Sequence, residues 1–424
     1  MIFKLFKKLL ISYTAKDLYY VSTGNLIIII TGFIFTVLVA RNLTPEYFGV
    51  FSAVASLTLI FSDMGDLGIG GGLANFLPPL IQKNDHLSVA KIIKTTLFLQ
   101  LSSALIIYLI FFFFSKDIAF LILQSQSIDS IYFVRLAAIG VILFMLFNFF
   151  NSVLGAKEQF RKTFWLMFSY SIPRLLILLL ISLFINLDTA KTLLIFFVGP
   201  LIGCIIGALM VNLNFIKAKG FYPIKKIFNF SIFLLMNKIF VSLFSRLDII
   251  MLTSLASSYA AGIYSAASRV ALIYPLIGGS LATVLAPRYA RFSKIEAITY
   301  TKKVFLLISG LVLSLLLLMS FSPFLINLIY GREYSDAGVV LTVLLLSMSP
   351  FLLAIPTNNL LTYTIKKPQV IASSSLIQLI IIFFLNILLI PKLGSLAPAV
   401  SVGIASLTAM LISFTAVAYF LKKT

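Results

Sequence analysis

The sequence predicts an all-α integral membrane protein with about twelve transmembrane helices. Of its 424 residues, 61% are hydrophobic and only 11% are charged, whereas a soluble domain carries about 25% charged residues. The apolar residues form continuous runs of the length that a helix needs to cross a bilayer, about 20 residues, and do not alternate as barrel strands do. Basic residues gather in every second loop, which supports an even number of helices.

The apolar runs divide the chain into two halves. The candidate spans are 18–40, 47–72, 91–114, 131–154, 164–185, 192–215, 229–253, 260–285, 304–322, 338–361, 371–390 and 397–420. Residues 1–17 are basic and apolar, and we expect them to form an uncleaved amphipathic segment at the membrane interface. We expect an N-terminal six-helix bundle at 18–215, a cytoplasmic linker at 216–228 and a C-terminal six-helix bundle at 229–424.

The distribution of basic residues predicts the orientation of these spans. With the N-terminus inside, most lysines and arginines outside the spans fall in cytoplasmic segments, where positive charge is retained. The basic residues of the outer loops are Arg41, Lys116, Lys191, Arg332 and Lys392. Both termini are therefore predicted to be cytoplasmic.

The two halves repeat one another weakly. The stretch 49–65 aligns without gaps to 262–278, and each opens the second helix of its half. The matched pairs are Gly49/Gly262, Ser52/Ser265, Ala53/Ala266, Leu59/Leu272, Ile60/Ile273 and Gly65/Gly278. A parallel repeat of two six-helix bundles commonly encloses a central cavity that opens to alternate sides. We expect Gly49 and Gly262 to occupy equivalent places where helices approach closely.

Charged residues inside the spans are the candidates for function. A charge near the bilayer centre costs about 3 kcal/mol, so it is expected to face protein or water and to serve a function. The cations are Arg135, Arg174, Lys238, Arg246 and Arg269, and the acids are Asp63, Asp66 and Asp248. The excess of cations favours an anionic ligand.

The stretch "NKIFVSLFSRLDI" places Lys238, Ser242, Ser245 and Arg246 on one helical stripe, because residues three and four apart share a face. Asp248 points nearly opposite to Arg246, so each needs a partner elsewhere. Asp248 either pairs with an arginine of another span or couples transport to an ion.

Each of the other charges also has two interpretations. Arg174 follows Pro173 and either satisfies a backbone carbonyl freed by the proline or grips a phosphate with its planar fork, which we favour. Arg269 is interpreted in the same way. Arg135 lies near a helix end, where it either lines the cavity or snorkels to the interface.

Asp63 and Asp66 share one face of the second span. They either bind a coupling ion, act as partners for cavity arginines, or cap a helix near the glycine run 70–72. These glycines lack the Lys-Ser/Thr ending of a phosphate loop. We expect them to loosen a helix end so that it can bend.

Several motifs resemble the Wzx-type oligosaccharide flippases, in the polysaccharide transporter branch of the MATE-like superfamily that also holds multidrug and toxin extruders. The stretches are "LVARNLTPEYFGVFS" (38–52), "DMGDLGIGGGL" (63–73), "SRLDIIMLTSLASSYAAGIYSAASRV" (245–270), "APRYARF" (286–292), "LIYGREYSDAGVVLTVL" (328–344) and "NILLIPKLGSLAPAVSVGIAS" (386–406). The last departs from the family pattern, with Ser395 and Pro398 where small Gly and Ala are usual. The resemblance covers nearly the whole chain.

The resemblance implies a transporter, not an enzyme, in the bacterial cytoplasmic membrane. It would flip undecaprenyl-diphosphate-linked oligosaccharide repeat units, such as those of O-antigen, from the inner to the outer leaflet by alternating access. H⁺ or Na⁺ is the candidate coupling ion, and polysaccharide assembly proteins are candidate partners. We assign substrate binding to Arg174, Arg246, Arg269, Lys238 and Arg135. We assign ion coupling to Asp63, Asp66 and Asp248, and we expect no cofactor, metal site or catalytic residue.

Two alternatives remain open on the sequence. A multidrug extruder of the same superfamily would be expected to show an acidic excess for its cationic ligands. A membrane-embedded polysaccharide polymerase or ligase usually carries a large outer loop, and the longest outer loop here, 115–130, is short. Nucleic acid is not expected as a partner, because the net charge of +20 is spread over short loops. The single cysteine, Cys204, and the single histidine, His86, cannot build a Cys/His metal cluster.

Overall fold

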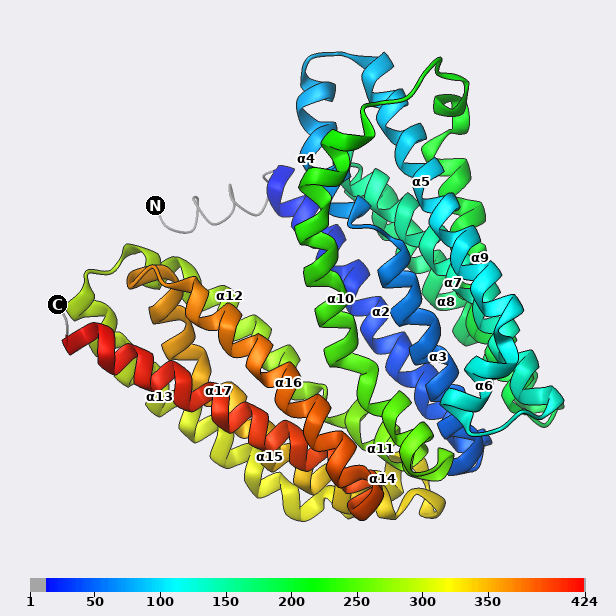
Figure 1. Ribbon diagram of the computed structural model, residues 1–424. Coiled ribbons are helices and arrows are strands. Elements are labelled where there is room, and N and C mark those ends of the chain that lie inside the picture. Colours follow the sequence, from blue (N-terminus) through cyan, green and yellow to red (C-terminus); the bar gives the residue numbers. More distant parts are fainter. Residues whose placement is uncertain (1–12, 423–424) are drawn as a thin grey trace. The chain divides into compact units, whose positions relative to one another are not determined.

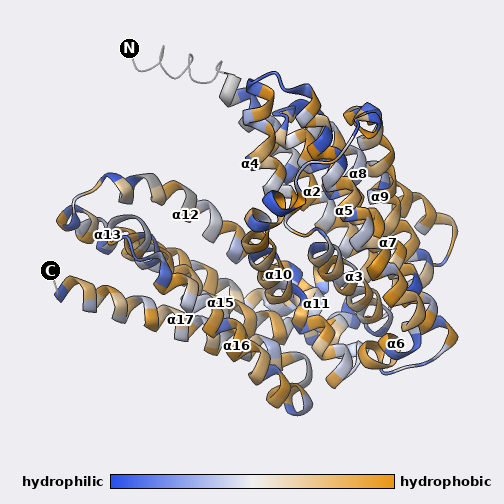
Figure 2. Ribbon diagram, turned by 45° about the horizontal axis from the view of Figure 1, so that its top comes forward, coloured by the Kyte–Doolittle hydropathy of each residue, from blue (hydrophilic) through white to orange (hydrophobic). Residues whose placement is uncertain are grey.

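The computed structural model describes residues 13–422, and every regular element among them is a helix. Eleven segments are long and apolar enough to cross a membrane, and the last of them, Pro368–Lys422, contains the two helices α16 (Pro368–Leu393) and α17 (Ala397–Lys422). The predicted fold class, an all-α multi-pass membrane protein, is confirmed. Figure 2 shows apolar residues along the helices and hydrophilic residues mostly at helix ends and loops. Most of the predicted interfacial segment 1–17 lies outside the described residues.

The helices form two compact units (Figure 1). The first contains the described residues up to Leu43 and Phe51–Leu247, and the second contains Thr44–Val50 and Asp248 onward. The chain thus passes between the units inside helix α10 (Ile224–Leu255), whereas the sequence places the domain boundary in the linker 216–228.

The first unit is built from long helices and two short ones. Besides most of α10, they are α2 (Tyr13–Asn42), α3 (Pro45–Gly65), α4 (Ile69–Gln82), α5 (His86–Phe113), α6 (Ser115–Leu123), α7 (Ile128–Ala156), α8 (Phe160–Phe184) and α9 (Thr189–Val211). Helix α2 packs along α8, and α7 packs on α5 and α9. Side-chain caps define three of the helix starts: the oxygens of Asp85, Ser127 and Asp188 accept hydrogen bonds from backbone N–H groups in the first turns of α5, α7 and α9.

The second predicted span, 47–72, is interrupted. Helix α3 ends at Gly65, and α4 begins at Ile69 after Leu67 and Gly68, whose φ angles are 53° and 69°. Left-handed backbone angles cannot continue a right-handed helix, and glycine adopts them without the clash of a Cβ. The chain bends just before the glycine run 70–72, as the sequence predicts, and the bend leaves Asp66 between two helices.

The connection between α9 and α10 is tied to the first unit. The ammonium of Lys94 on α5 donates a hydrogen bond to the carbonyl of Ala218 at 2.8 Å. The neighbouring hydroxyl of Thr95 accepts a hydrogen bond from the backbone N–H of Tyr222, also at 2.8 Å. Lys94 additionally lies over the ring of Phe221, 5.0 Å from its centroid. These contacts hold the linker against α5, so α10 starts from a defined place.

The second unit consists of helices and short 3-10 or π turns. Its longer helices, besides α16 and α17, are α11 (Ser258–Ala271), α12 (Ile273–Arg291), α13 (Lys294–Leu317), α14 (Ser322–Tyr330) and α15 (Asp336–Asn359). Helix α17 packs on both α15 and α16, and α15 also packs on α11, α12 and α13. The predicted span 260–285 is not one continuous helix, because it is divided at Leu272 into α11 and α12.

Gly49 and Gly262, the predicted repeat partners, face each other within the second unit. A Cβ on Gly49 would fall on the carbonyl oxygen of Ser258, and a Cβ on Gly262 would fall on that of Pro45. The sequence shift that relates Gly49 to Gly262 also relates Pro45 to Ser258, so each repeat makes the same contact to the other. The start of α3 and the start of α11 therefore touch backbone to backbone, as small residues allow in membrane helix pairs.

Replacing either glycine of this pair should separate the two helices. We expect Gly49→Ala and Gly262→Ala each to destabilise the protein by about 2 kcal/mol or more, because the methyl group meets rigid backbone on both sides. Gly310→Ala on α13 is the matched control, since its Cβ meets nothing within 4 Å. Thermal unfolding in detergent compares the three variants. Equal melting temperatures for Gly49→Ala and Gly310→Ala would contradict the close contact.

Candidate functional site

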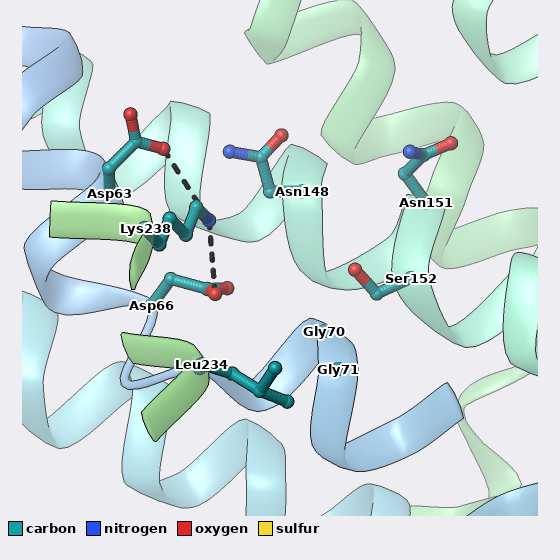
Figure 3. Close-up of a pocket in the computed structure, with 10 residues that line it drawn as sticks. Asp63, Asp66, Gly70, Gly71, Asn148, Asn151, Ser152, Leu234 and Lys238 are labelled. Carbon is teal, nitrogen blue, oxygen red and sulfur yellow. Dashed lines mark ion pairs between the residues drawn. The ribbon is translucent and has the colours of Figure 1, made fainter. Parts of the chain in front are cut away.

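Two carboxylates meet one ammonium at the end of α3. Lys238 on α10 lies 3.0 Å from Asp66 and 3.4 Å from Asp63, measured from Nζ to the carboxylate oxygens (Figure 3). Asp63 is in the last turn of α3, and Asp66 is in the bend that follows. The break in the helix keeps both acids on the side that faces α10. Lys238 therefore bridges two carboxylates that would otherwise repel each other.

A second cation approaches Asp63 from about two turns further along α10. The guanidinium of Arg246 lies 3.4 Å from Asp63 and donates a hydrogen bond to the hydroxyl of Ser242 at 2.8 Å. That hydroxyl in turn donates to Asp63 at 2.8 Å. The predicted stripe on α10 thus faces protein at Lys238, Ser242 and Arg246. Ser245 is exposed and donates to the carbonyl of Val241 instead.

The charged cluster, defined as Asp63, Asp66, Lys238 and Arg246, carries no net charge. Asp66 is its most buried member, with a side chain 5% exposed, and its second oxygen accepts a hydrogen bond from the amide of Gln100 at 3.3 Å. Gln100 also donates to a carbonyl of α7 at 3.0 Å. Balanced charge and hydrogen bonds to the carboxylates are what allow ionised groups to persist among apolar helices.

A polar pocket of about 390 Å³ opens beside the charged cluster, inside the first unit (Figure 3). Helix α7 contributes Asn148, Asn151 and Ser152, and α4 contributes the glycines at its start. Sequence analysis did not identify these three polar residues or Gln100. Uncharged polar residues are common in membrane helices, so the only available signal was their spacing on one face of α7.

Arg174 is separate from the charged cluster. Its side chain is buried within the first unit, 3% exposed, and its guanidinium lies 4.7 Å from the ring centroids of Phe35 and Tyr170 and 5.5 Å from that of Phe196. It donates a hydrogen bond to the hydroxyl of Tyr170 at 2.9 Å. Gly199 on α9 makes room for it, since a Cβ there would lie 3.1 Å from its Cδ. Among residues 13–422, Arg174 makes no hydrogen bond to the backbone carbonyl that Pro173 leaves free.

The remaining two predicted arginines are exposed. Arg135 lies near the start of α7, donates to the hydroxyl of Ser115 at 3.3 Å and stacks over Phe112 at 5.0 Å. This position at a helix end favours the snorkelling interpretation. Arg269 lies in the last turn of α11, where a cation interacts favourably with the helix dipole.

Asp248 lies in the second unit and has neutral partners. Its carboxylate accepts hydrogen bonds from the hydroxyl of Tyr264 at 2.7 Å and from the amide of Asn386 at 3.1 Å. Asp248 is 7% exposed. Among the ion pairs that join residues 13–422, none includes Asp248, so the first of its two interpretations, a pair with an arginine of another span, is not found. Sequence analysis missed Tyr264 and Asn386, which lie on other helices.

Replacing Lys238 should show how much the repulsion between Asp63 and Asp66 lowers the stability of the protein. We expect Lys238→Met to destabilise the protein by about 1–3 kcal/mol, because the buried Asp66 loses its counterion. The loss is not larger, because water partly screens the exposed part of the lysine. Adding Asp66→Asn should recover most of that loss, and the coupling is read from a double-mutant cycle of melting temperatures in detergent.

Lys191→Met is the control for this cycle. Lys191 forms an ion pair with Asp188 at 2.9 Å, but both side chains are about half exposed, so its loss should cost at most about 1 kcal/mol. An equally small effect of Lys238→Met would argue against a buried charge cluster.

The fold is similar to that of several solved transporters. A multidrug resistance MATE family transporter of the MOP superfamily, in its inward-facing conformation, matches with a TM-score of 0.73 at 12% identity, covering 93% of this chain and 95% of that one. The lipid II flippase MurJ, in an inward closed conformation, matches with a TM-score of 0.70 at 16% identity, covering 94% and 87%. A MOP superfamily transporter from Pyrococcus furiosus has a TM-score of 0.63 at 13% identity and covers 94% of each chain. At these identities the likeness establishes the MATE/MurJ-like fold.

Sequence comparison identifies more specific relatives. The capsular polysaccharide biosynthesis protein CapF of Staphylococcus aureus is 29% identical over 204 residues. The matched stretch spans about half of each protein, 47% of this chain and 50% of CapF. The polysaccharide biosynthesis protein family matches residues 14–296, which is more than half of the chain. The protein belongs to the polysaccharide biosynthesis protein family and has the fold of the MOP superfamily.

Proposed function

We propose that the protein is a flippase that moves a polyprenyl-diphosphate-linked oligosaccharide from the inner to the outer leaflet of the bacterial cytoplasmic membrane. Membership of a polysaccharide biosynthesis family supports a saccharide substrate. The fold supports transport, because its similar structures include a flippase and multidrug transporters. A lipid-linked substrate reconciles the two, since its polar headgroup has to cross an apolar core.

One observation carries the proposal: a charge-balanced cluster and a polar pocket lie inside a unit built from apolar spanning helices. Polar groups at such depth are costly and mark substrate paths. A drug extruder would need apolar and aromatic walls for lipophilic cations. The residues that line this pocket include no aromatic side chain.

The charge balance favours transport driven by the membrane potential. The charged cluster contributes no net charge, so the empty carrier can return without moving cluster charge through the field. A diphosphate carries about two negative charges, and an inside-negative potential of about 100 mV assists their outward movement by about 4–5 kcal/mol. We assign contact with the diphosphate to Arg269 of the second unit, whose side chain is exposed.

Transport should therefore respond to voltage. In proteoliposomes, outward flipping of a fluorescent polyprenyl-diphosphate-linked disaccharide should accelerate several-fold under an inside-negative potassium diffusion potential. A glycosidase added outside measures the flipped fraction. Arg269→Ala should abolish flipping, and Arg269→Lys should retain part of it, because lysine keeps the charge without the fork. Transport of tetraphenylphosphonium in place of the lipid would favour the multidrug extruder.

We further propose Asp248 as the residue that couples transport to H⁺ or Na⁺. A buried carboxylate with only neutral partners retains the capacity to bind a cation. The carbonyl oxygen of the Asn386 side chain is buried without a hydrogen-bond partner among the described residues and could contribute a second oxygen. Asp63 and Asp66 fit this role less well, because Lys238 already occupies the space between them.

Asp248→Asn tests this coupling. The amide keeps the size of the carboxylate and cannot bind a coupling cation as strongly. We expect the variant to flip lipid at normal protein level while losing any dependence of the rate on a proton or sodium gradient. Asp63→Asn is the comparison, and it should retain that dependence. A variant with reduced protein level and unchanged ion dependence would show that Asp248 is structural.

A further inference from the structure

The polar pocket of the first unit has a defined architecture. It lies between the end of α3, the glycine-rich start of α4, and one face each of α7 and α10. Its volume of about 390 Å³ falls within the usual range of small-molecule pockets and is far larger than a single buried water needs. The only side chain without a polar group that lines it is Leu234, apart from the glycines.

Glycines give the pocket its depth on the α4 side. A Cβ on Gly70 would lie 2.9 Å from the hydroxyl of Ser152, and a Cβ on Gly71 would fall on the side chain of Leu234. Any larger residue would therefore fill the space between α4 and its neighbours. Because the glycines have no side chains, the backbone of α4 itself forms the pocket wall that faces α7.

Three polar side chains of α7 are available for a ligand. Asn148, Asn151 and Ser152 share one helix face, being three and four residues apart. Their side chains make no hydrogen bond to the part of the chain that the structure describes, and the Asn151 carbonyl oxygen is buried. Figure 3 shows them on the wall that faces Lys238 and its carboxylates. A buried polar group left unpaired costs about 1–3 kcal/mol, so water or a ligand is expected to satisfy the Asn151 oxygen.

The electrostatics of the pocket disfavour an anion. Of the charged side chains that line it, two are the carboxylates Asp63 and Asp66 and one is Lys238, which already bridges them. A diphosphate would meet one shared cation and two like charges. The pocket also disfavours a lipophilic cation, which needs aromatic faces.

The hydrogen-bonding groups instead suit hydroxyls. Carboxylates accept, the ammonium donates, and amide and hydroxyl side chains do both. A sugar ring presents adjacent hydroxyl groups that each donate and accept, and it can therefore use both kinds of partner at once.

We propose that this pocket is a saccharide subsite, which binds a neutral sugar unit of the transported glycan by its hydroxyls. The proposal rests on the proposed function and adds where the sugar is held. It gives Asp63 and Asp66 the role of hydroxyl acceptors, and it gives Lys238 the role of holding the two carboxylates together. The diphosphate is then bound by Arg269, outside this pocket.

Protection of an introduced cysteine tests the subsite. Ser152→Cys is placed in a Cys204→Ala background, and the purified protein is labelled with a charged methanethiosulfonate reagent. N-acetylglucosamine, galactose and rhamnose are each added as competitors, beside inorganic pyrophosphate and tetraphenylphosphonium. We expect at least one of the sugars to slow labelling several-fold, and we expect the other two compounds to leave the rate unchanged.

The other outcomes separate this subsite from the function on which it rests. Protection by pyrophosphate alone would overturn the saccharide assignment while leaving a lipid-linked diphosphate substrate intact. Protection by tetraphenylphosphonium would overturn both proposals in favour of a drug extruder. Equal labelling in the presence of every competitor would overturn the subsite.

A pair of glycine variants distinguishes binding from folding. Gly70→Ala places a methyl group against Ser152 and narrows the pocket, whereas Gly155→Ala on α7 meets nothing within 4 Å. Saturation-transfer NMR of the protecting sugar on otherwise unmodified protein should lose most of its signal with Gly70→Ala and keep it with Gly155→Ala. Asn151→Leu should behave as Gly70→Ala does, at an unchanged melting temperature. Undiminished signal in both pocket variants would place the sugar elsewhere.

Discussion

The contact of Lys238 with two carboxylates is the interaction on which the first unit's polar interior depends. Asp63 and Asp66 lie close enough to share one ammonium, at 3.4 and 3.0 Å, and lipid offers no solvent to separate like charges. The bridge allows α3 to end at Gly65 with two acids facing α10. The bend after α3, the approach of Arg246 through Ser242 and the glycine-lined pocket all lie around this arrangement.

The sequence predicted the fold class and most of the helix positions, because bilayer thickness imposes a length on each apolar run. It also predicted that Lys238, Ser242 and Arg246 share one face, since helical spacing determines direction. It predicted a helix end that can bend near the glycine run 70–72, but not that the second span is interrupted earlier, at Leu67 and Gly68. Hydropathy averages over such a break, which depends on two backbone angles.

The candidate site was less predictable from the sequence. Helical periodicity predicts on which face of its own helix a side chain lies, but not which other helix packs against that face. Asp248 was expected to need a partner, yet Tyr264 and Asn386 come from distant segments that carry no charge to attract notice. Asn148 and Asn151 were overlooked for the same reason. Arg174 was expected to grip phosphate, whereas its environment of three aromatic rings could not be inferred from the neighbouring Pro173.

The aromatic enclosure of Arg174 gives the first unit a stationary source of positive potential. Ring faces attract a guanidinium through their quadrupoles without cancelling its charge, as a carboxylate would. None of the ion pairs that join residues 13–422 includes Arg174, so no neighbouring acid cancels the field that it projects into the surrounding helices. An anion entering these apolar surroundings, as the proposed diphosphate would, meets a positive potential that is already in place and needs no rearrangement of the protein to create it.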